Sequence, residues 1–205
     1  MSQIKLYPEL REKLNSLEKL EIPASRKKIL QGLIDFIQQK KNSEESIQLN
    51  FICTHNSRRS QFAQIWAKTI SANYGIETEC FSGGTEETAF FENAITALQR
   101  AGFDITVGSG TNPKAQVHFA ENHAALTCYS KVFDASENPD QNFAAVMTCS
   151  HADENCPFIP GSDARIALDY SDPKEFDGTP KAAEKYDERS DQIASEMMYV
   201  FKNIK

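Results

Sequence analysis

The order of apolar runs and helix-like stretches after residue 45 is the feature that most constrains how this chain can fold. Strand-like runs alternate with helical stretches: the runs are 47–53, 76–82, 143–149 and 165–170, and the helical stretches are 57–73, 90–102 and the tail from Lys181. The run FAAVMTC at 143–149 is apolar throughout most of its length, which is typical of a buried parallel strand. This alternation indicates βαβ units and therefore predicts an α/β domain with a mostly parallel sheet.

Two segments fall outside the alternation. Residues 1–45 have leucines at helical spacing and a break at Ile22-Pro23-Ala24, which predicts a helical extension packed on the main domain, residues 46–205. A dimerisation or partner-binding role is the alternative for this extension. Residues 112–134 contain two alternating runs, which predict an inserted β-hairpin.

Composition narrows the class of protein. The 205-residue chain has a net charge of −7, which argues against nucleic acid or an anionic membrane as a partner but leaves room for a small anion in one loop. No apolar run reaches the ~18 residues of a membrane span, and the N-terminus is too charged for a signal peptide, so we expect a cytoplasmic protein. The odd number of cysteines argues against a disulfide framework, and C-x-x-C and H-E-x-x-H are both absent, so no metal site is expected.

The segment CTHNSRRS joins the first predicted strand to the helix that follows it. Cys53 ends the strand and Arg59 begins the helix, which is the position where open parallel sheets bind ligands. Free backbone N–H groups at a helix start can surround one tetrahedral oxyanion. The residues predicted to form this oxyanion site are Thr54, His55, Asn56, Ser57, Arg58 and Arg59.

The cysteine gives this loop a chemical meaning. A thiol at a helix N-terminus near Arg59 has its thiolate form favoured, and Ser60 can donate its hydroxyl to the sulfur. Arg59 can clamp two oxygens of the bound anion. We predict that the Cys53 thiolate attacks phosphorus or arsenic. The alternative is a buried strand-end cysteine beside a solvated helix start.

Cys149 ends the third predicted strand, which places it on the same sheet edge as Cys53. A helix between Cys149 and Cys156 would separate them by two turns, roughly 10 Å, whereas a disulfide requires Cα atoms within about 7 Å. A bond between them therefore requires this segment to loop or unwind. The alternative is two unrelated core cysteines. Cys80 and Cys128 are predicted to be packing residues.

A carboxylic acid is also needed to protonate a leaving oxygen. Asp172-Pro173 is the one Asp-Pro pair in the sequence, and it follows the fourth predicted strand. This position points to the same sheet edge, so Asp172 is the predicted general acid. An ordinary Asp-Pro turn is the alternative.

These motifs resemble a known family. CTHNSRRS with its flanking strand and helix, SGGTEE and Asp172-Pro173 are similar to the low-molecular-weight protein tyrosine phosphatase superfamily. Within it, CSHADENCP resembles the redox segment of the thioredoxin-coupled arsenate reductases. The resemblance covers residues 46–205 apart from the insertion. It implies a four-stranded parallel sheet with helices on both faces.

The resemblance also implies a reaction and a partner. Cys53 attacks arsenate held by the loop and Arg59, and Asp172 assists the departing oxygen. Cys149 then forms a disulfide with Cys53 and releases arsenite. Cys156 next displaces Cys53, and thioredoxin reduces the Cys149–Cys156 disulfide. The resemblance implies no bound cofactor.

The chain departs from the family pattern C-T-G-N-S-C-R-S at two loop positions. His55 replaces the glycine, which requires a permitted φ angle, and Arg58 replaces the inner cysteine and is expected to face solvent. Lys174 stands where tyrosine phosphatases present an aromatic residue. We therefore favour the arsenate reductase. The alternatives are a phosphatase acting on phosphotyrosine or another phosphomonoester, with Cys149 and Cys156 as a redox guard, and a non-enzymatic thiol sensor or oxyanion-binding protein.

Overall fold

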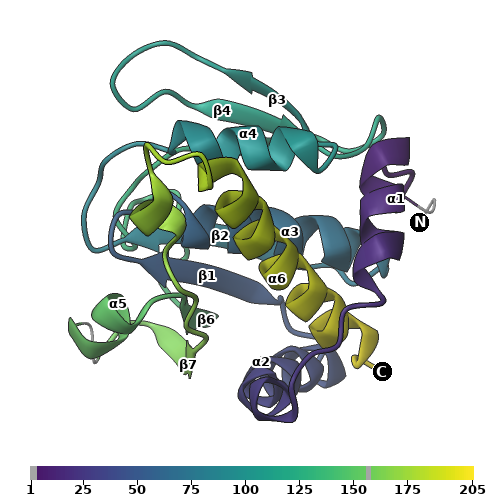
Figure 1. Cartoon of the computed structure of the whole chain (residues 1–205). Helices are drawn as coiled ribbons and strands as arrows, with labels where there is room; N and C mark the ends of the chain where they lie inside the picture. The colour runs from purple at the N-terminus through teal and green to yellow at the C-terminus, as the bar shows by residue number, and fades with distance from the viewer. Residues whose placement is uncertain (1–3, 156–157) are drawn as a thin grey trace.

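The centre of the fold is a parallel sheet. The computed structural model describes residues 4–155 and 158–205. The sheet has four strands in the order β2-β1-β6-β7, all parallel: β1 (Gln48–Cys53), β2 (Glu79–Gly84), β6 (Phe143–Met147) and β7 (Ser162–Ala167) (Figure 1). The predicted four-stranded parallel sheet is confirmed. β2 begins and ends later than expected and β7 begins and ends earlier.

Helices cover both faces of this sheet. They are α1 (Pro8–Leu17), α2 (Ala24–Asn42), α3 (Arg59–Asn73), α4 (Glu92–Arg100), α5 (Ser150–Asn155) and α6 (Ala182–Lys202), with a short 3₁₀ helix η1 (Pro173–Phe176). The larger core joins Leu49 and Phe51 of β1 to α3 and α6. The smaller core joins Ile52 and Met147 to Ala152 of α5. No helix in the described ranges is both long and apolar enough to cross a membrane.

The N-terminal extension is built into the larger core. α1 and α2 contact α6 at separate places along its length, and α2 also contacts β7 (Figure 1). Leu10 and Leu33 are completely buried in the same cluster as the sheet residues. Arg26 of α2 donates to Glu196 of α6 at 2.8 Å, and this bond ties α2 to α6. The extension therefore packs on the domain as the sequence predicts, and the two share one hydrophobic core.

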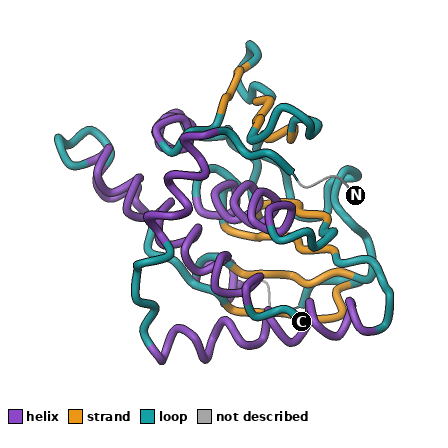
Figure 2. Tube along the Cα trace, turned by 90° about the vertical axis from the view of Figure 1, so that its right-hand side faces the viewer, coloured by secondary structure: helices purple, strands orange, loops and turns teal. Residues whose placement is uncertain are grey.

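The insertion is larger than the predicted hairpin. It forms a three-stranded antiparallel sheet in the order β3-β4-β5, from β3 (Asp104–Val107), β4 (Ala115–His118) and β5 (Leu126–Cys128). β3 was missed because it is only four residues long and mostly exposed, which leaves little apolar pattern. Figure 2 shows this small sheet standing apart from the parallel sheet. The chain that leaves it returns to β2, where Gly84 N–H donates to Lys131 and Phe133 N–H donates to Gly84.

Candidate active site

The thiol of Cys53 lies at the carboxyl edge of the parallel sheet, below the loop 54–58. Cys53 is almost completely buried, and its Sγ lies 3.1 Å from Ser60 Oγ in the first turn of α3. Asn56 Nδ2 donates to the same Ser60 oxygen at 2.8 Å. Because Ser60 Oγ already accepts from Asn56, the Ser60 hydroxyl proton is free to donate to the sulfur. The Ser60 hydroxyl is therefore placed to donate to the sulfur of the predicted nucleophile.

The backbone N–H groups of this loop are available to bind an anion. Within the described residues, no acceptor takes a hydrogen bond from the backbone N–H groups of residues 54–59. These groups lead into the N-terminus of α3, where the helix dipole adds partial positive charge. The curvature comes from Asn56, which has a left-handed φ of 46°, whereas His55 is not among the residues with positive φ. A histidine is therefore tolerated at position 55.

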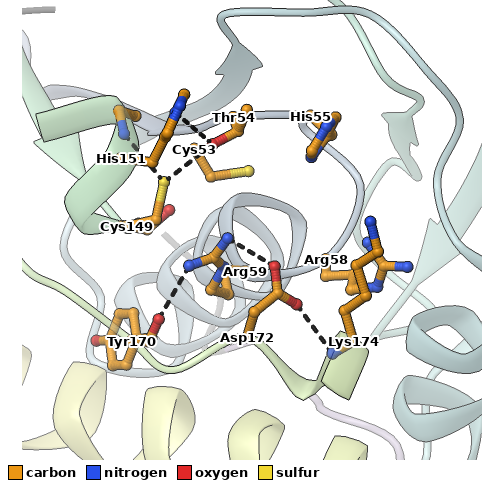
Figure 3. Close-up of polar contacts among 12 residues, drawn as sticks. Cys53, Thr54, His55, Arg58, Arg59, Cys149, His151, Tyr170, Asp172 and Lys174 are labelled. Carbon is orange, nitrogen blue, oxygen red and sulfur yellow. Dashed lines mark hydrogen bonds and ion pairs between the residues drawn. The ribbon is translucent and has the colours of Figure 1, made fainter. Parts of the chain in front are cut away.

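Arg59 lies between the two cysteines and Asp172 (Figure 3). Its Nη2 donates to Asp172 Oδ2 at 2.7 Å, and its Nη1 donates to the Tyr170 carbonyl at 3.1 Å. Its Nε is buried, and no acceptor among the described residues bonds it. Asp172 also accepts from Lys174 N–H at 3.1 Å, which caps η1. The predicted Arg59 and Asp172 thus meet, and the buried Nε–H of Arg59 has no acceptor among the described residues.

Arg58 does not face solvent, so that expectation is wrong. Its Nε donates to Tyr186 at 2.6 Å, its Nη2 donates to Asp177 at 3.0 Å, and its guanidinium lies 4.0 Å from the centre of the Phe91 ring. Burial raises the pKa of Tyr186, and its hydroxyl donates to Asp177. The Arg58 side chain therefore anchors the loop to α6 instead of supplying a guanidinium to an oxyanion.

The remaining loop side chains also turn away from the anion position. His55 Nε2 lies 3.5 Å from Glu86, and Ser57 Oγ donates to the Ala89 carbonyl at 2.7 Å. Thr54 turns toward Cys149. Of the six residues predicted to bind an oxyanion, Arg59 is the one with a fully buried side-chain donor that no described acceptor bonds. The other five can contribute backbone N–H groups, which have no acceptor among the described residues.

Cys149 follows β6 and meets the Cys53 loop, as the shared sheet edge predicts. Cys149 Sγ lies 3.5 Å from Thr54 Oγ1, accepts from Ala152 N–H at 3.4 Å, and is 1% exposed. The predicted partner Cys156 lies outside the described residues. Sequence reasoning missed His151, whose Nδ1 lies 3.3 Å from Thr54 Oγ1, because a lone histidine in this segment matches no motif.

The small antiparallel sheet and the end of β2 brace this loop. Lys131 N–H, on the chain leaving β5, donates to Asn56 Oδ1 at 3.0 Å, and Ser130 Oγ donates to the His55 carbonyl at 2.8 Å. A Cβ atom at Gly84 would lie 2.7 Å from Thr54 O and 2.9 Å from Asn56 N. Glycine is therefore required where β2 meets the loop.

The other two cysteines in the described residues differ from Cys53 and Cys149. Burial raises the pKa of the Cys80 thiol to about 12, and burial does the same for Cys128. Both remain protonated near neutral pH, which agrees with their predicted role in packing.

Comparisons with known proteins give the family. The family model "Low molecular weight phosphotyrosine protein phosphatase" matches residues 48–197. Arsenate reductase 2 of Staphylococcus epidermidis is 32% identical over 123 residues, covering 60% of this chain and 76% of that protein.

Solved structures show the same fold. A YwlE mutant from Bacillus subtilis superposes with a TM-score of 0.50 at 18% identity, covering 77% of this chain and 97% of that one. A low molecular weight phosphotyrosine phosphatase from Vibrio cholerae also has a TM-score of 0.50, at 14% identity, covering 77% and 95%. The chain belongs to the low molecular weight phosphotyrosine protein phosphatase family. It is an enzyme of the arsenate reductase or phosphatase kind.

Proposed function

We propose that the chain is an arsenate reductase that uses Cys53 as nucleophile and Cys149 and Cys156 as a disulfide relay. One observation carries this proposal: a second buried thiol, Cys149, lies against the loop of the first, joined to it through Thr54. A phosphatase needs only the first thiol. The S. epidermidis relative named an arsenate reductase also favours this choice.

The first step uses the anion-binding loop. Arsenate would accept hydrogen bonds from the backbone N–H groups of residues 54–59 and from Arg59 Nε. The Cys53 thiolate, which Ser60 stabilises, attacks arsenic and forms a sulfur–arsenic bond. Asp172, oriented by Arg59, gives its proton to an arsenic-bound oxygen, which leaves as water.

The later steps transfer two electrons from sulfur to arsenic. The Cys149 thiolate attacks Cys53 Sγ, the S–S bond forms, and the sulfur–arsenic electron pair leaves with arsenic as arsenite. Cys156 then attacks Cys149 and releases Cys53, and the dithiol of thioredoxin reduces the Cys149–Cys156 disulfide. In the structure Cys149 is followed by the helix α5, so this last bond requires α5 to unwind.

A phosphatase is the second candidate because the loop fits any tetrahedral oxyanion. Phosphate ester hydrolysis would use the same Cys53, Arg59 and Asp172, through a phosphocysteine intermediate. The match to a phosphatase family model keeps this candidate open. Against it, Lys174 is an exposed residue of η1 at the position where the resemblance leads us to expect an aromatic side chain.

A coupled assay tests the choice. The purified protein is mixed with arsenate, thioredoxin, thioredoxin reductase and NADPH, and NADPH loss is followed beside aryl phosphate hydrolysis. We expect arsenate-dependent NADPH loss, which both Cys53→Ser and Cys156→Ser abolish. Cys53→Ser also abolishes any hydrolysis, whereas Cys156→Ser leaves it intact. Cys80→Ala, which removes a buried thiol elsewhere, is the control.

Two results would overturn the proposal. Aryl phosphate hydrolysis without arsenate-dependent NADPH loss would identify a phosphatase. Reversible thiol oxidation with neither turnover would identify a sensor.

A further inference from the structure

A chain of three side chains leads from Cys149 to the surface. Cys149 Sγ lies 3.5 Å from Thr54 Oγ1, and Thr54 Oγ1 lies 3.3 Å from His151 Nδ1 (Figure 3). Cys149 is 1% exposed, whereas His151 is an exposed residue. The Thr54 hydroxyl therefore joins a buried thiol to a group that can exchange protons with water.

Cys149 needs such a path because only the thiolate is a nucleophile. A thiol as buried as that of Cys149 has little direct contact with solvent through which to lose its proton. Histidine is the side chain whose ordinary pKa suits proton uptake near neutral pH. We propose that His151, acting through the Thr54 hydroxyl, accepts the proton of Cys149 as Cys149 attacks the sulfur of Cys53. This inference deepens the proposed function, and its part in turnover rests on that function.

The proton and electron movements balance. The Cys149 proton passes to Thr54 Oγ1 while the Thr54 hydroxyl proton passes to His151 Nδ1, so Thr54 is unchanged. The path requires the histidine tautomer with its proton on Nε2 before reaction. The Cys149 electron pair forms the bond to Cys53 Sγ, and the group bound to Cys53 departs with its own pair. The Ala152 N–H, 3.4 Å from Cys149 Sγ, stabilises the developing thiolate.

Other charged groups surround this site. Asp153 of α5 pairs with Arg165 of β7 at 2.7 Å. Asp169, after β7, lies within the electrostatic range of Arg59, Asp153 and Glu154. Thr54 Oγ1 hydrogen-bonds Cys149 and His151 and no other residue in the part of the chain that the structure describes. His151 is therefore the titratable group placed to receive the proton.

The test isolates the attack of Cys149. In a Cys156→Ser background the reaction stops at the Cys53–Cys149 disulfide. Hydrogen peroxide converts the Cys53 thiolate to a sulfenic acid with loss of hydroxide, and Cys149 then expels a second hydroxide. Dimedone competes for the sulfenic acid. The ratio of disulfide to dimedone adduct, measured by mass spectrometry, reports the second step independently of the first.

We expect His151→Asn to lower this ratio about tenfold near neutral pH. This decrease is smaller than a general base usually contributes, because the thiol can still lose its proton slowly to water. Asparagine keeps a polar group near the Nδ1 position but cannot take the proton. Thr54→Val has the same effect, and Thr54→Ser restores the ratio. The deficit shrinks as pH rises, since hydroxide then deprotonates Cys149. His123→Asn, on the small sheet, is the matched control and leaves the ratio unchanged.

In the peroxide series, the inference is overturned by an unchanged ratio in His151→Asn or by the absence of a Cys53–Cys149 disulfide in the parent. A parallel series with arsenate separates the two proposals. If arsenate yields no arsenite while the peroxide series behaves as expected, the proposal of arsenate reduction is refuted and the proposal of the proton path is supported. If arsenite forms at the same rate in the parent and in His151→Asn, only the proposal of the proton path is refuted.

Discussion

The Cys53 loop and the α5 segment meet at one sheet edge, but the chain holds them differently. The loop is tied to β2 by the close contact at Gly84, to the chain leaving β5 by Lys131, and to α6 by Arg58. α5 is only six residues long and rests on β1 and β6, with Arg165 reaching Asp153. A loop that binds a transition state benefits from fixed geometry. In the proposed relay, the segment that carries Cys149 must move.

The two faces of the parallel sheet also differ in how much apolar packing they carry. α3 and α6 lie on the face with the larger core, whereas α5 covers the smaller one. Local opening takes less free energy where few apolar contacts break. In the proposed relay, the firmly packed face would carry the first step, and the face with fewer apolar contacts would carry the segment that unwinds for the disulfide exchange.

The largest expected effect on stability comes from breaking the Arg58 anchor. Arg58→Met leaves Asp177 without its cationic partner. Because the Asp177 side chain is 26% exposed, we expect the free energy of unfolding to fall by about 3 kcal/mol, the low end of the range for breaking a buried pair. Urea unfolding measures it. The matched control is Arg100→Met, whose pair with Asp187 is exposed and contributes less than about 1 kcal/mol. Equal losses in the two variants would show that Arg58 is not an anchor.

The next effect is on the first chemical step. Gly84→Ala places a Cβ atom 2.7 Å from Thr54 O, so the loop must shift. A shift of about 1 Å lowers kcat/KM by about a hundredfold. The rate of arsenate reduction, or of aryl phosphate hydrolysis, measures it. Gly32→Ala on α2, where the nearest atom is 3.9 Å away, is the control. An unchanged rate in Gly84→Ala would mean that the loop is not rigidly held.

The smallest effect is expected in α5. Asp153→Asn removes the partly exposed pair with Arg165 and lowers stability by less than about 1 kcal/mol. Hydrogen exchange should quicken at the amides of α5 and stay unchanged in α3. The step carried out by Cys53 alone should keep its rate. Faster exchange spread over the Cys53 loop would show that the two regions are not independent.

Local sequence signals predicted the frame of this molecule. Apolar runs and helix periodicity identified the parallel sheet, and the strand–loop–helix pattern placed Cys53, Arg59, Cys149 and Asp172 at one edge. This succeeded because the carboxyl ends of parallel strands converge, so strand position fixes which residues meet.

Contacts between distant residues could not be predicted in this way. Arg58 and Tyr186 are 128 positions apart, and Asn56 and Lys131 are 75 apart, so no local pattern links them. β3 was missed because only one of its four residues is buried, which leaves no alternating apolar pattern to recognise. His151 approaches Thr54 only because β1 and β6 are neighbours, a pairing that composition does not encode.

The central claim is that the two thiols at this edge act in sequence on arsenate. The direct test mixes reduced Cys156→Ser protein with one equivalent of arsenate and counts arsenite and the Cys53–Cys149 disulfide. The account predicts equimolar arsenite and disulfide, and neither product in Cys149→Ser. Arsenite formed without the disulfide, or no arsenite while Cys53 remains reactive, would contradict it.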